Sequence, residues 1–527
     1  MSAGSGLPAQ TDVVIVGAGL AGLAAARRLH RAGTPWLLVE AAERLGGRVG
    51  TDAVDGYLID RGFQVVNTGY PRLSALVDLT SLGLGYFTQG VLVRRGETLH
   101  RMVHPLRDPL GAARTVLTGL ADAAGVGRLA NASVGLGGPS GNASVGLGGP
   151  SGNASVGLGG RSGNASVGLG GRSGNASVGL GGRSGSASAG HDGPRNGSAG
   201  IGRPGEAPKG EDVDRVVGGR LADVRRISSV GRASDRLRLA ALAARCASLP
   251  VHRLLAAPET STEAALRRAG LSDRIVEELL RPFLSGVFGE RELTTSSHVF
   301  AMIVRSFARG RIGLPAAGIA ALPEAVAAPL PESLIALGVS ATSLRPGLVR
   351  TSAGAVRCRA VLVAADPATA TALLPPLGRV RMNTLTTYYH STAEPPLDEP
   401  ILLLDGDRRE LVANTVVVSR AAPTYAPAGR HLVATSVAGP VVPPEPVVRA
   451  ELARLYGRPV DDWEHLTTVS VPEALPAAPA PQGRLRKPVA LGEGIFVAGD
   501  HRGSPSVQGA LASGWRAAGA INRCLGG

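Results

Sequence analysis

A short apolar run that leads into three spaced glycines places the strongest constraint on how this chain can fold. The segment TDVVIVGAGLAGLAAARRL, residues 11–29, carries Gly17, Gly19 and Gly22 between a β-branched run and an Ala/Leu/Arg pattern. This order predicts a buried strand, a tight turn and a helix that begins beside the turn. In such a unit the glycines permit the turn, the approach of a pyrophosphate and close packing of helix on strand. The helix N-terminus then offers free N–H groups to the phosphates.

A carboxylate follows at the end of the next predicted strand. The strand PWLLVE ends in Glu40, where a side chain can accept hydrogen bonds from ribose hydroxyls and repel a 2′-phosphate. The residues therefore favour the ADP moiety of NAD or FAD over that of NADP. The adjoining EAAERLGGRV adds Gly46, Gly47 and Arg48, a second loop able to approach a phosphate, for which a bare NAD domain has no need.

The far end of the chain carries another glycine-rich signature, GIFVAGDHRGSPSVQGALASGWRAAGAI, residues 494–521. It predicts a buried strand, a turn at Gly499 and Asp500 and, after a loop, a helix for which Ser506 is a suitable N-cap. Small residues recur on one face of this helix from Gly509 onwards, where a flat ring could lie close. A terminal helix packed against a sheet through small residues is the alternative.

Most of the glycine excess lies in a repeated segment. The unit NASVGLGGPSG or NASVGLGGRSG recurs every eleven residues from Asn131 to Asn175, and a degenerate copy begins at Ser186. Gly, Ser and Asn at this density bury too little apolar surface to offset the entropy of ordering, so we expect disorder. A folded array with a thin core of one Val and one Leu per unit is the alternative. We interpret residues 131–234 as an insertion between folded pieces.

Composition argues against several classes of function. The net charge is +14, which is typical of an arginine-biased genome, and attraction to an anionic partner such as a membrane is the alternative. Aromatic residues make up 3% of the chain, too few to serve as stacking platforms, so we expect no nucleic-acid partner. The three cysteines stand singly, so neither a disulfide framework nor a metal site is indicated. No signal-peptide pattern is found, and we expect a cytoplasmic protein, with peripheral membrane contact through the basic residues 219–246 as the alternative.

Four segments together resemble the flavin-containing amine oxidase / phytoene desaturase superfamily of FAD-dependent oxidoreductases. They are VVIVGAGLAGLAAARRL, VEAAERLGGRV, LIDRGFQVV and GIFVAGDHRGSPSVQGALASGWRAA. The resemblance implies FAD as the cofactor and so decides between the two dinucleotides that the residues left open. It also implies an α/β fold: a Rossmann-like FAD-binding domain that is discontinuous in sequence, an α+β substrate domain and the long low-complexity insertion.

The resemblance, with the pattern of apolar residues, divides the chain into interleaved parts. We expect the FAD-binding domain at residues 1–75, 310–375 and 485–527, the substrate domain at 76–130, 235–309 and 376–484, and the repeat insertion at 131–234. Strands are predicted at 12–16, 36–39, 361–364 and 495–498, and helices at 20–32, 263–269, 272–280, 320–328 and 507–523.

The resemblance also implies site residues along the whole cofactor. Gly17, Gly19 and Gly22 would cradle the FAD pyrophosphate, and Glu40 would hold the adenosine ribose. The other implied contacts are Gly46, Gly47 and Arg48 with the diphosphate or ribityl region, Ala341 with adenine through its backbone, Gly62 and Gln64 near the flavin ring, Gly499 and Asp500 with the diphosphate and ribityl chain, and Gln508, Gly509 and Ala510 against the isoalloxazine.

The implied activity is oxidation or desaturation of a largely apolar small molecule, carotenoid- or terpenoid-like, by hydride transfer to the flavin. Oxygen or a quinone would accept the electrons. Many amine oxidases of the superfamily use a lysine near the flavin, but this chain has only Lys209 and Lys487, neither in a suitable segment. We therefore assign no catalytic residue. An amine oxidase, a protoporphyrinogen oxidase, and a flavin-bound non-redox isomerase or partner protein are the alternatives.

Overall fold

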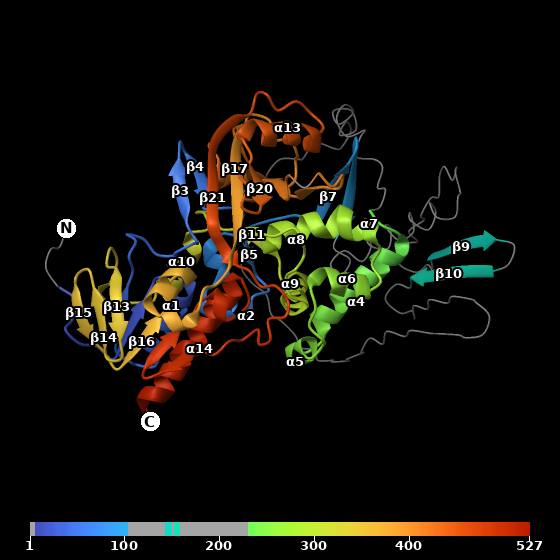
Figure 1. Cartoon of the computed structure of the whole chain (residues 1–527). Coiled ribbons are helices and arrows are strands. Elements are labelled where there is room, and N and C mark those ends of the chain that lie inside the picture. Colours follow the sequence, from blue (N-terminus) through green and yellow to red (C-terminus); the bar gives the residue numbers. More distant parts are fainter. Residues whose placement is uncertain (1–5, 104–142, 150–151, 159–229, 410, 527) are drawn as a thin grey trace, which may run out of the picture. The chain divides into compact units, whose positions relative to one another are not determined.

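The computed structural model describes residues 6–103, 143–149, 152–158, 230–409 and 411–526 (Figure 1). The chain divides into two compact units, one of residues 1–123 and 218–527 and the other of residues 124–217. Of the elements formed by described residues, all except β9 and β10 belong to the first unit.

A six-stranded sheet brings both glycine signatures to one edge. Its strands run in the order β12-β2-β1-β16-β23-β22, and every neighbouring pair is parallel except β22 with β23. The inner strands β1, β2 and β16 are buried throughout, which accounts for their continuous apolar runs. The bounds are β1 (Val13–Val16), β2 (Trp36–Val39), β12 (Ile335–Ala336), β16 (Ala360–Val363), β22 (Ala490–Gly492) and β23 (Ile495–Val497).

Different layers cover the two faces of this sheet, because side chains alternate along each strand. Val13 and Ile15 of β1 pack with α1, α10 and α14, whereas Val14 and Val16 pack with a small three-stranded sheet and α11. The elements involved are α1 (Leu20–Arg31), α10 (Ala321–Ala327), α11 (Pro367–Leu373), α14 (Val507–Gly526), β13 (Ala341–Arg345), β14 (Leu348–Thr351) and β15 (Gly354–Arg357).

The helices that follow the two glycine signatures lie side by side, although one begins near the start of the chain and the other ends it (Figure 1). Their contact depends on small residues. A Cβ on Gly514 of α14 would lie 1.9 Å from the carbonyl oxygen of Ala21 in α1. The small-residue face predicted for the last helix therefore packs on α1.

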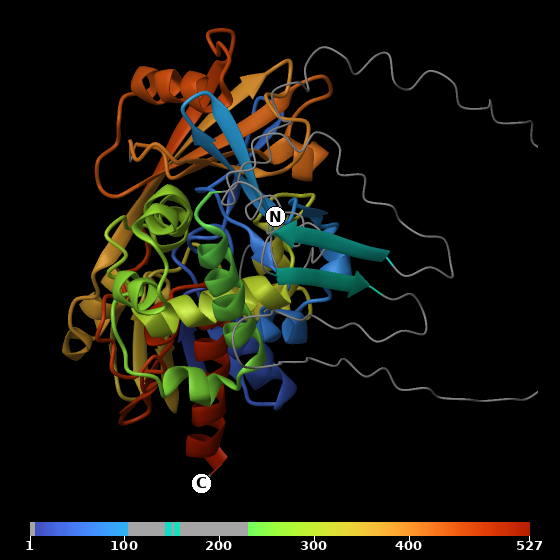
Figure 2. The same cartoon turned by 90° about the vertical axis from the view of Figure 1, so that its right-hand side faces the viewer.

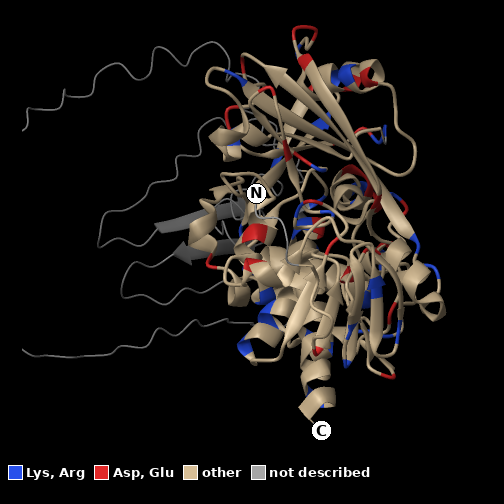
Figure 3. Ribbon diagram, turned by 90° about the vertical axis from the view of Figure 1, so that its left-hand side faces the viewer, with Lys and Arg blue, Asp and Glu red and all other residues tan. Residues whose placement is uncertain are grey.

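The second large sheet of this unit has seven strands. Its order is β21-β17-β20-β19-β18-β7-β8. Tyr388 of β17 packs on the side of α13, and Tyr389 packs on the other side, against the β3–β4 hairpin region. Figure 3 shows the strands of both sheets largely without charged residues. The bounds are β7 (Gly90–Arg95), β8 (Thr98–Val103), β17 (Met382–Thr392), β18 (Leu402–Asp405), β19 (Asn414–Val417), β20 (His431–Ala438), β21 (Glu464–Pro476), α12 (Val418–Ala421) and α13 (Glu445–Tyr456).

A group of helices, green in Figures 1 and 2, packs against β7 and β18 of this sheet. The helix predicted at 272–280 is confirmed, but its last five residues form a π-helix, η3. Among the described residues, none of the helices is both long and apolar enough to cross a bilayer. The bounds are α4 (Ala233–Ser248), α5 (Val251–Leu255), α6 (Thr262–Arg268), α7 (Asp273–Ile275), η3 (Val276–Leu280), α8 (Arg281–Phe288) and α9 (Ser297–Arg309).

Short elements connect the two sheets. A hairpin of β3 and β4 precedes a three-stranded sheet in the order β5-β11-β6, and α2 lies between β5 and β6 in the chain. The bounds are β3 (Thr51–Val54), β4 (Tyr57–Asp60), β5 (Val66–Asn67), β6 (Gly85–Tyr86), β11 (Ile312–Leu314) and α2 (Pro71–Leu76).

The second unit contains two described strands. Strands β9 (Ala143–Gly149) and β10 (Gly152–Leu158) come from successive repeat copies and pair antiparallel, with Val145 opposite Val156. Residues 230–234, the end of the predicted insertion, are also described and lead into α4, which begins at Ala233. The remaining residues of the insertion lie outside the described ones, and their predicted disorder stays a prediction, as do the predicted domain boundaries. The predicted α/β class, with a Rossmann-like parallel sheet, is confirmed.

Candidate cofactor site

The three glycines of the first signature occupy the turn between β1 and α1. Gly17 has φ +105°, and a Cβ there would lie 2.9 Å from the carbonyl carbon of Ala364. A Cβ on Gly22 would lie 1.9 Å from the carbonyl oxygen of Gly17. These two glycines are therefore required by the packing of the chain itself. A Cβ on Gly19 would meet nothing within 4 Å, so Gly19 faces open space at the N-terminus of α1.

Glu40 places its carboxylate beside this turn, directly after β2. Its Oε2 accepts a hydrogen bond from the Ala18 N–H at 2.6 Å, and its Oε1 accepts one from the Ala42 N–H at 2.9 Å. The Val339 N–H donates to the Glu40 carbonyl at 2.8 Å, and Ala341 begins β13 two residues later. Glu40, predicted to hold the ribose, and Ala341, predicted to contact the adenine, thus lie on neighbouring segments.

The second glycine loop lies against the first. The Gly46 N–H donates to the Ala18 carbonyl at 3.0 Å, and Gly19 and Gly46 form an isolated parallel bridge. Gly47 has φ +58°, and the one atom that its Cβ would meet within 4 Å is the Cα of Gly19, at 3.6 Å. The two loops therefore approach each other at glycines, with no side chain between Gly19 and Gly47.

Arg44 holds the shape of this second loop and was missed by the sequence analysis. Its guanidinium donates to the carbonyls of Gly47 at 3.0 Å and Val49 at 3.3 Å. A Cβ on Gly50 would lie 2.5 Å from the same guanidinium. The glycine-rich context marked the loop, but no local pattern distinguishes an arginine that folds back onto backbone carbonyls from a solvated one.

An ion pair between a half-buried arginine and a buried aspartate joins the beginning and the end of the chain. Arg48 donates to Asp500 Oδ1 at 2.8 Å and to the Ala474 carbonyl at 2.8 Å, and Asp500 is 6% exposed. Burial lowers the pKa of Arg48, but the charge and hydrogen bond of Asp500, together with the charges of Asp366 and Glu473, outweigh this effect and the pKa is raised. The Gly499 N–H donates to Ser513 Oγ at 2.9 Å, which fixes the turn to α14.

Gln64 and Gly62 belong to a loop between this ion pair and the seven-stranded sheet. The Gln64 side-chain amide donates to the Arg48 carbonyl at 3.0 Å, and Gly62 has φ +88°. The Phe63 N–H donates to Thr387 Oγ1 of β17 at 3.1 Å. Of the two predicted residues, Gln64 therefore contacts the backbone of Arg48 in the folded chain.

The first turn of α14 carries Gln508, Gly509 and Ala510. The predicted N-cap is confirmed, because Ser506 Oγ accepts a hydrogen bond from the Gly509 N–H at 3.1 Å. Gln508 Oε1 accepts one from the Arg72 N–H at 2.9 Å, so this carbonyl is used to attach α2. A Cβ on Gly509 would lie 1.8 Å from the Ser504 carbonyl oxygen, which requires glycine for packing alone.

Asp60 is a second residue to which the sequence analysis gave no role. Its Oδ1 accepts hydrogen bonds from the Thr51 hydroxyl at 2.6 Å and the Ile319 N–H at 3.0 Å, and its Oδ2 accepts one from the Tyr425 hydroxyl at 2.9 Å. Burial raises the pKa of Asp60 to about 6, against the lowering effect of these bonds. The carboxyl of Asp60 thus joins three segments just before the Gly62–Gln64 loop. The backbone carbonyl of Asp60 also accepts a hydrogen bond, from the Tyr389 hydroxyl at 2.9 Å.

These residues fit the ADP half of a dinucleotide and the start of a flavin chain. Gly19 caps the N-terminus of α1 at a point where a Cβ would meet no atom, and the Glu40 carboxylate lies over the same turn. The Arg48–Asp500 pair follows at the adjacent strand end, where the carboxyl ends of parallel strands form the usual ligand crevice.

A small apolar cavity of about 10 Å³, room for roughly one water molecule, adjoins this site. It lies among α8, α9, the end of β21 and the loop that leads to α14. Leu475 in its wall follows Ala474, the residue whose carbonyl holds Arg48, and Pro505 lies between Asp500 and α14. The lining residues are Val287, Phe288, Thr295, Val299, Ile303, Leu475, Pro476, Ala478 and Pro505, none of them ionisable.

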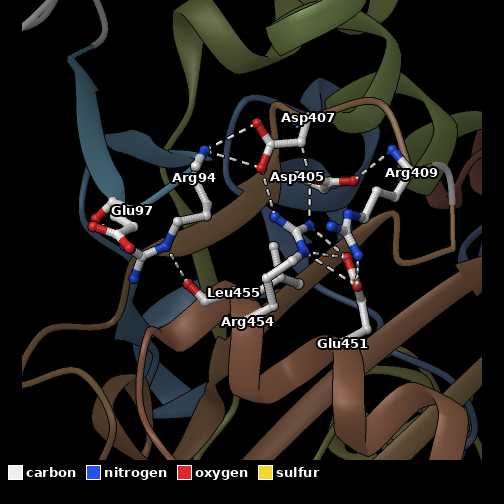
Figure 4. Close-up of polar contacts among 9 residues, drawn as sticks. Arg94, Glu97, Asp405, Asp407, Arg409, Glu451, Arg454 and Leu455 are labelled. Atoms are coloured by element: carbon white, nitrogen blue, oxygen red, sulfur yellow. Dashed lines mark hydrogen bonds and ion pairs between the residues drawn. The ribbon is translucent and has the colours of Figure 1, made fainter.

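A second buried charge cluster lies away from this site, where α13 packs beside the end of β18 (Figure 4). Arg454 binds Asp405 at 2.5 Å, Asp407 at 2.7 Å and also Glu451. Burial lowers the pKa of Arg454, but its hydrogen bonds to Glu451 and Asp405 outweigh burial and the pKa is raised. The Arg94 guanidinium donates to the Leu455 carbonyl at 2.8 Å. The cluster attaches α13 to the sheet.

Comparison with solved structures shows which fold the chain shares. A putative protoporphyrinogen oxidase from Exiguobacterium sp. 255-15 superposes with a TM-score of 0.58 at 18% identity, over 98% of this chain and 100% of that chain. Cyclohexylamine oxidase from Brevibacterium oxydans IH-35A gives 0.56 at 15% identity, over 98% and 100%. Identities this low show the fold alone.

Curated relatives match shorter segments. Putrescine oxidase of Kocuria rosea is 41% identical over 97 residues, which are 18% of this chain and 19% of that protein. Lysine-specific histone demethylase 2 of Homo sapiens is 52% identical over 57 residues, 11% and 7% of the two chains. The matched segments thus span less than a fifth of either relative.

The family model gives a longer match. The model of flavin-containing amine oxidoreductases matches residues 20–113 and 209–522, which together are more than half of the chain. This match confirms the predicted cofactor, FAD, and the predicted class, an oxidoreductase. The chain belongs to the flavin-containing amine oxidoreductase family.

Proposed function

We propose that this enzyme oxidises a small, largely apolar molecule, with the substrate bound in the cavity beside Arg48 and Asp500. The observation that carries the proposal is the lining of that cavity, which holds eight apolar residues and Thr295. Bound FAD would supply the hydride acceptor. Oxygen or a quinone would take the electrons afterwards.

The protein's part in this reaction is to bind and orient. Gly19 and the N-terminus of α1 would receive the pyrophosphate, and Glu40 the ribose. Arg48, already paired with Asp500, would fix the position of that carboxylate toward the ribityl chain. Because no cavity residue is an acid or a base, the chain would supply no proton acceptor there.

The cavity disfavours a charged substrate. Burying an ammonium group requires a counter-charge or several hydrogen bonds, and no carboxylate lines the walls. The Thr295 hydroxyl already donates to Glu290 at 2.9 Å. An apolar group gains about 25 cal/mol for each Å² removed from water. The cavity of about 10 Å³ is smaller than such a group, so its apolar walls would have to move apart when a substrate enters.

An amine substrate is the second candidate, favoured by the name of one relative, putrescine oxidase. A porphyrinogen is favoured only by a shared fold with a protein titled a putative protoporphyrinogen oxidase. Peripheral membrane contact, proposed for residues 219–246, would suit a lipid-soluble substrate. The described part of that segment, residues 230–246, includes most of α4, where Leu237 is 58% exposed.

Anaerobic bleaching of the bound flavin tests the substrate class. We expect terpenoid or polyene compounds to bleach it and putrescine or cyclohexylamine to leave it oxidised. Bleaching by an amine and by no apolar compound would contradict the proposal. Ile303→Trp, which fills the cavity, should raise the concentration needed for half-maximal bleaching. Ile303→Val enlarges the same site and serves as the matched control for damage to α9.

A further inference from the structure

His501 is a buried imidazole with no hydrogen-bond partner among the described residues. It follows Asp500 in the short 3₁₀-helix η7 (Asp500–Arg502) and is 5% exposed. Neither Nδ1 nor Nε2 has a partner. A Cβ on Gly499 would lie 2.4 Å from Nδ1, so the ring lies directly against the turn that carries Asp500.

The surroundings of the ring leave it neutral. Burial lowers the pKa of His501 to about 4. Of the charged groups that face it, Asp500 raises this pKa, whereas Arg502, Lys487 and Arg48 lower it. A neutral imidazole carries one N–H donor and one acceptor, and both are unmet here. Because an unsatisfied buried polar group is destabilising, we expect the His501 ring to bond a group that is not part of the described chain.

His390 provides a contrast within the same molecule. It is fully buried in β17, and burial lowers its pKa to about 4 as well. Its Nε2 donates to Glu445 Oε1 at 2.9 Å, so the side chain has a structural partner. His501 has none, and it lies at the end of the strand where the cofactor site was located.

We propose that His501 is a further cofactor-binding residue, whose imidazole N–H donates to an oxygen of bound FAD. The inference rests on the FAD site proposed above, because it takes the Arg48–Asp500 pair as a marker of where the cofactor lies. In this proposal the unpaired N–H of His501 serves to bind the ligand and is not a packing defect of the core. Arg48 and Arg502 supply positive charge beside the ring. The neutral N–H of His501 would add a directed hydrogen bond to the same ligand.

The first experiment measures release of FAD from the full-length holoenzyme after dilution. His501→Leu removes both ring nitrogens with little change in volume, and we expect roughly 10- to 100-fold weaker FAD binding, the range for a lost hydrogen bond to a charged group. His501→Asn keeps an N–H donor and should recover part of the affinity. His390→Leu should release FAD at the wild-type rate.

The second experiment measures thermal unfolding of the flavin-free chain. His501→Leu should unfold at the same temperature as the wild type or higher, because an unsatisfied polar group is replaced by an apolar one. His390→Leu should unfold at a lower temperature, because Glu445 loses one of its two partners and keeps only Arg449. A merely structural His501, or one bridged to the protein by water, would give a less stable variant that still holds FAD as tightly as the wild type.

That result would overturn the inference. The Gly19→Asp variant separates this failure from failure of the site itself. If Gly19→Asp loses FAD and His501→Leu does not, only the role of His501 is wrong. If Gly19→Asp retains FAD, the site is wrong whatever His501 does.

Discussion

Two buried polar regions of this molecule differ in how completely their groups are paired. At the end of β18, Arg454 satisfies three carboxylates, and the cluster closes on itself (Figure 4). At the ends of β1 and β23, Gly19 faces open space and both ring nitrogens of His501 lack partners. Closed pairing indicates a structural role, whereas unmet groups beside open backbone indicate a ligand.

We expect the largest effect from a substitution that breaks the paired cluster around Arg454. Arg454→Ala leaves Asp405 buried without a counter-charge and Glu451 with only Arg409, at 3.9 Å, and we expect a loss of about 3–5 kcal/mol in the free energy of unfolding. Urea unfolding measures it. Arg61→Ala is the matched control, because the Arg61–Asp52 pair is exposed and should contribute about 1 kcal/mol or less. Reduced FAD affinity in the folded Arg454→Ala protein would contradict the division between the two regions.

The next effect concerns the open region. Gly19→Asp places a carboxylate where the pyrophosphate is expected, at the N-terminus of α1, and we expect about 100-fold weaker FAD binding or more, roughly 3 kcal/mol. Stability of the flavin-free chain should change little, because a Cβ meets no atom there. Fluorescence of released flavin reports the first quantity and thermal unfolding the second. Gly22→Ala should do the reverse and destabilise the fold, since its Cβ would meet the Gly17 carbonyl.

Asp60 should have an intermediate effect on the free energy of unfolding, and its raised pKa fixes how that effect changes with pH. Because burial raises its pKa to about 6 in the folded state, its contribution is fully present below the unfolded pKa of 3.8 and is lost as pH rises through 6. A shift of this size corresponds to roughly 3 kcal/mol. We expect unfolding free energies measured from pH 4 to 8 to fall less steeply in Asp60→Asn than in the wild type. Parallel pH profiles of the two proteins would show that Asp60 titrates normally.

The smallest effect tests the start of α14. Ser506→Ala removes the N-cap of the helix and should cost about 1 kcal/mol of unfolding free energy. Ser504→Ala, two residues earlier, is the control: its hydroxyl contacts the Ser506 hydroxyl and makes no bond to a helix N–H. Equal losses from both changes would show that the cap is not the source of the effect.

Local patterns predicted the parts of the site that local chemistry determines. The glycine turn, the strand before Glu40 and the cap at Ser506 depend on neighbouring residues, and their positions are confirmed. Asp60 could not be recognised, because its partners Ile319 and Tyr425 are more than 250 residues away. The same limit hid the contact of Gln508 with the backbone of Arg72. Long-range partners decide which polar residues are satisfied, and a sequence pattern does not contain them.

Flavin content of the full-length chain tests most directly whether both chain ends bind one cofactor. The protein would be saturated with FAD, freed of excess flavin and assayed by visible absorption, alongside Gly19→Asp and Asp500→Ala. We expect one FAD per wild-type chain and a loss of flavin in each variant, since each removes one end of the site. A wild-type chain that stays colourless, or a chain that keeps its full flavin content after either change, would contradict this structure-based assignment.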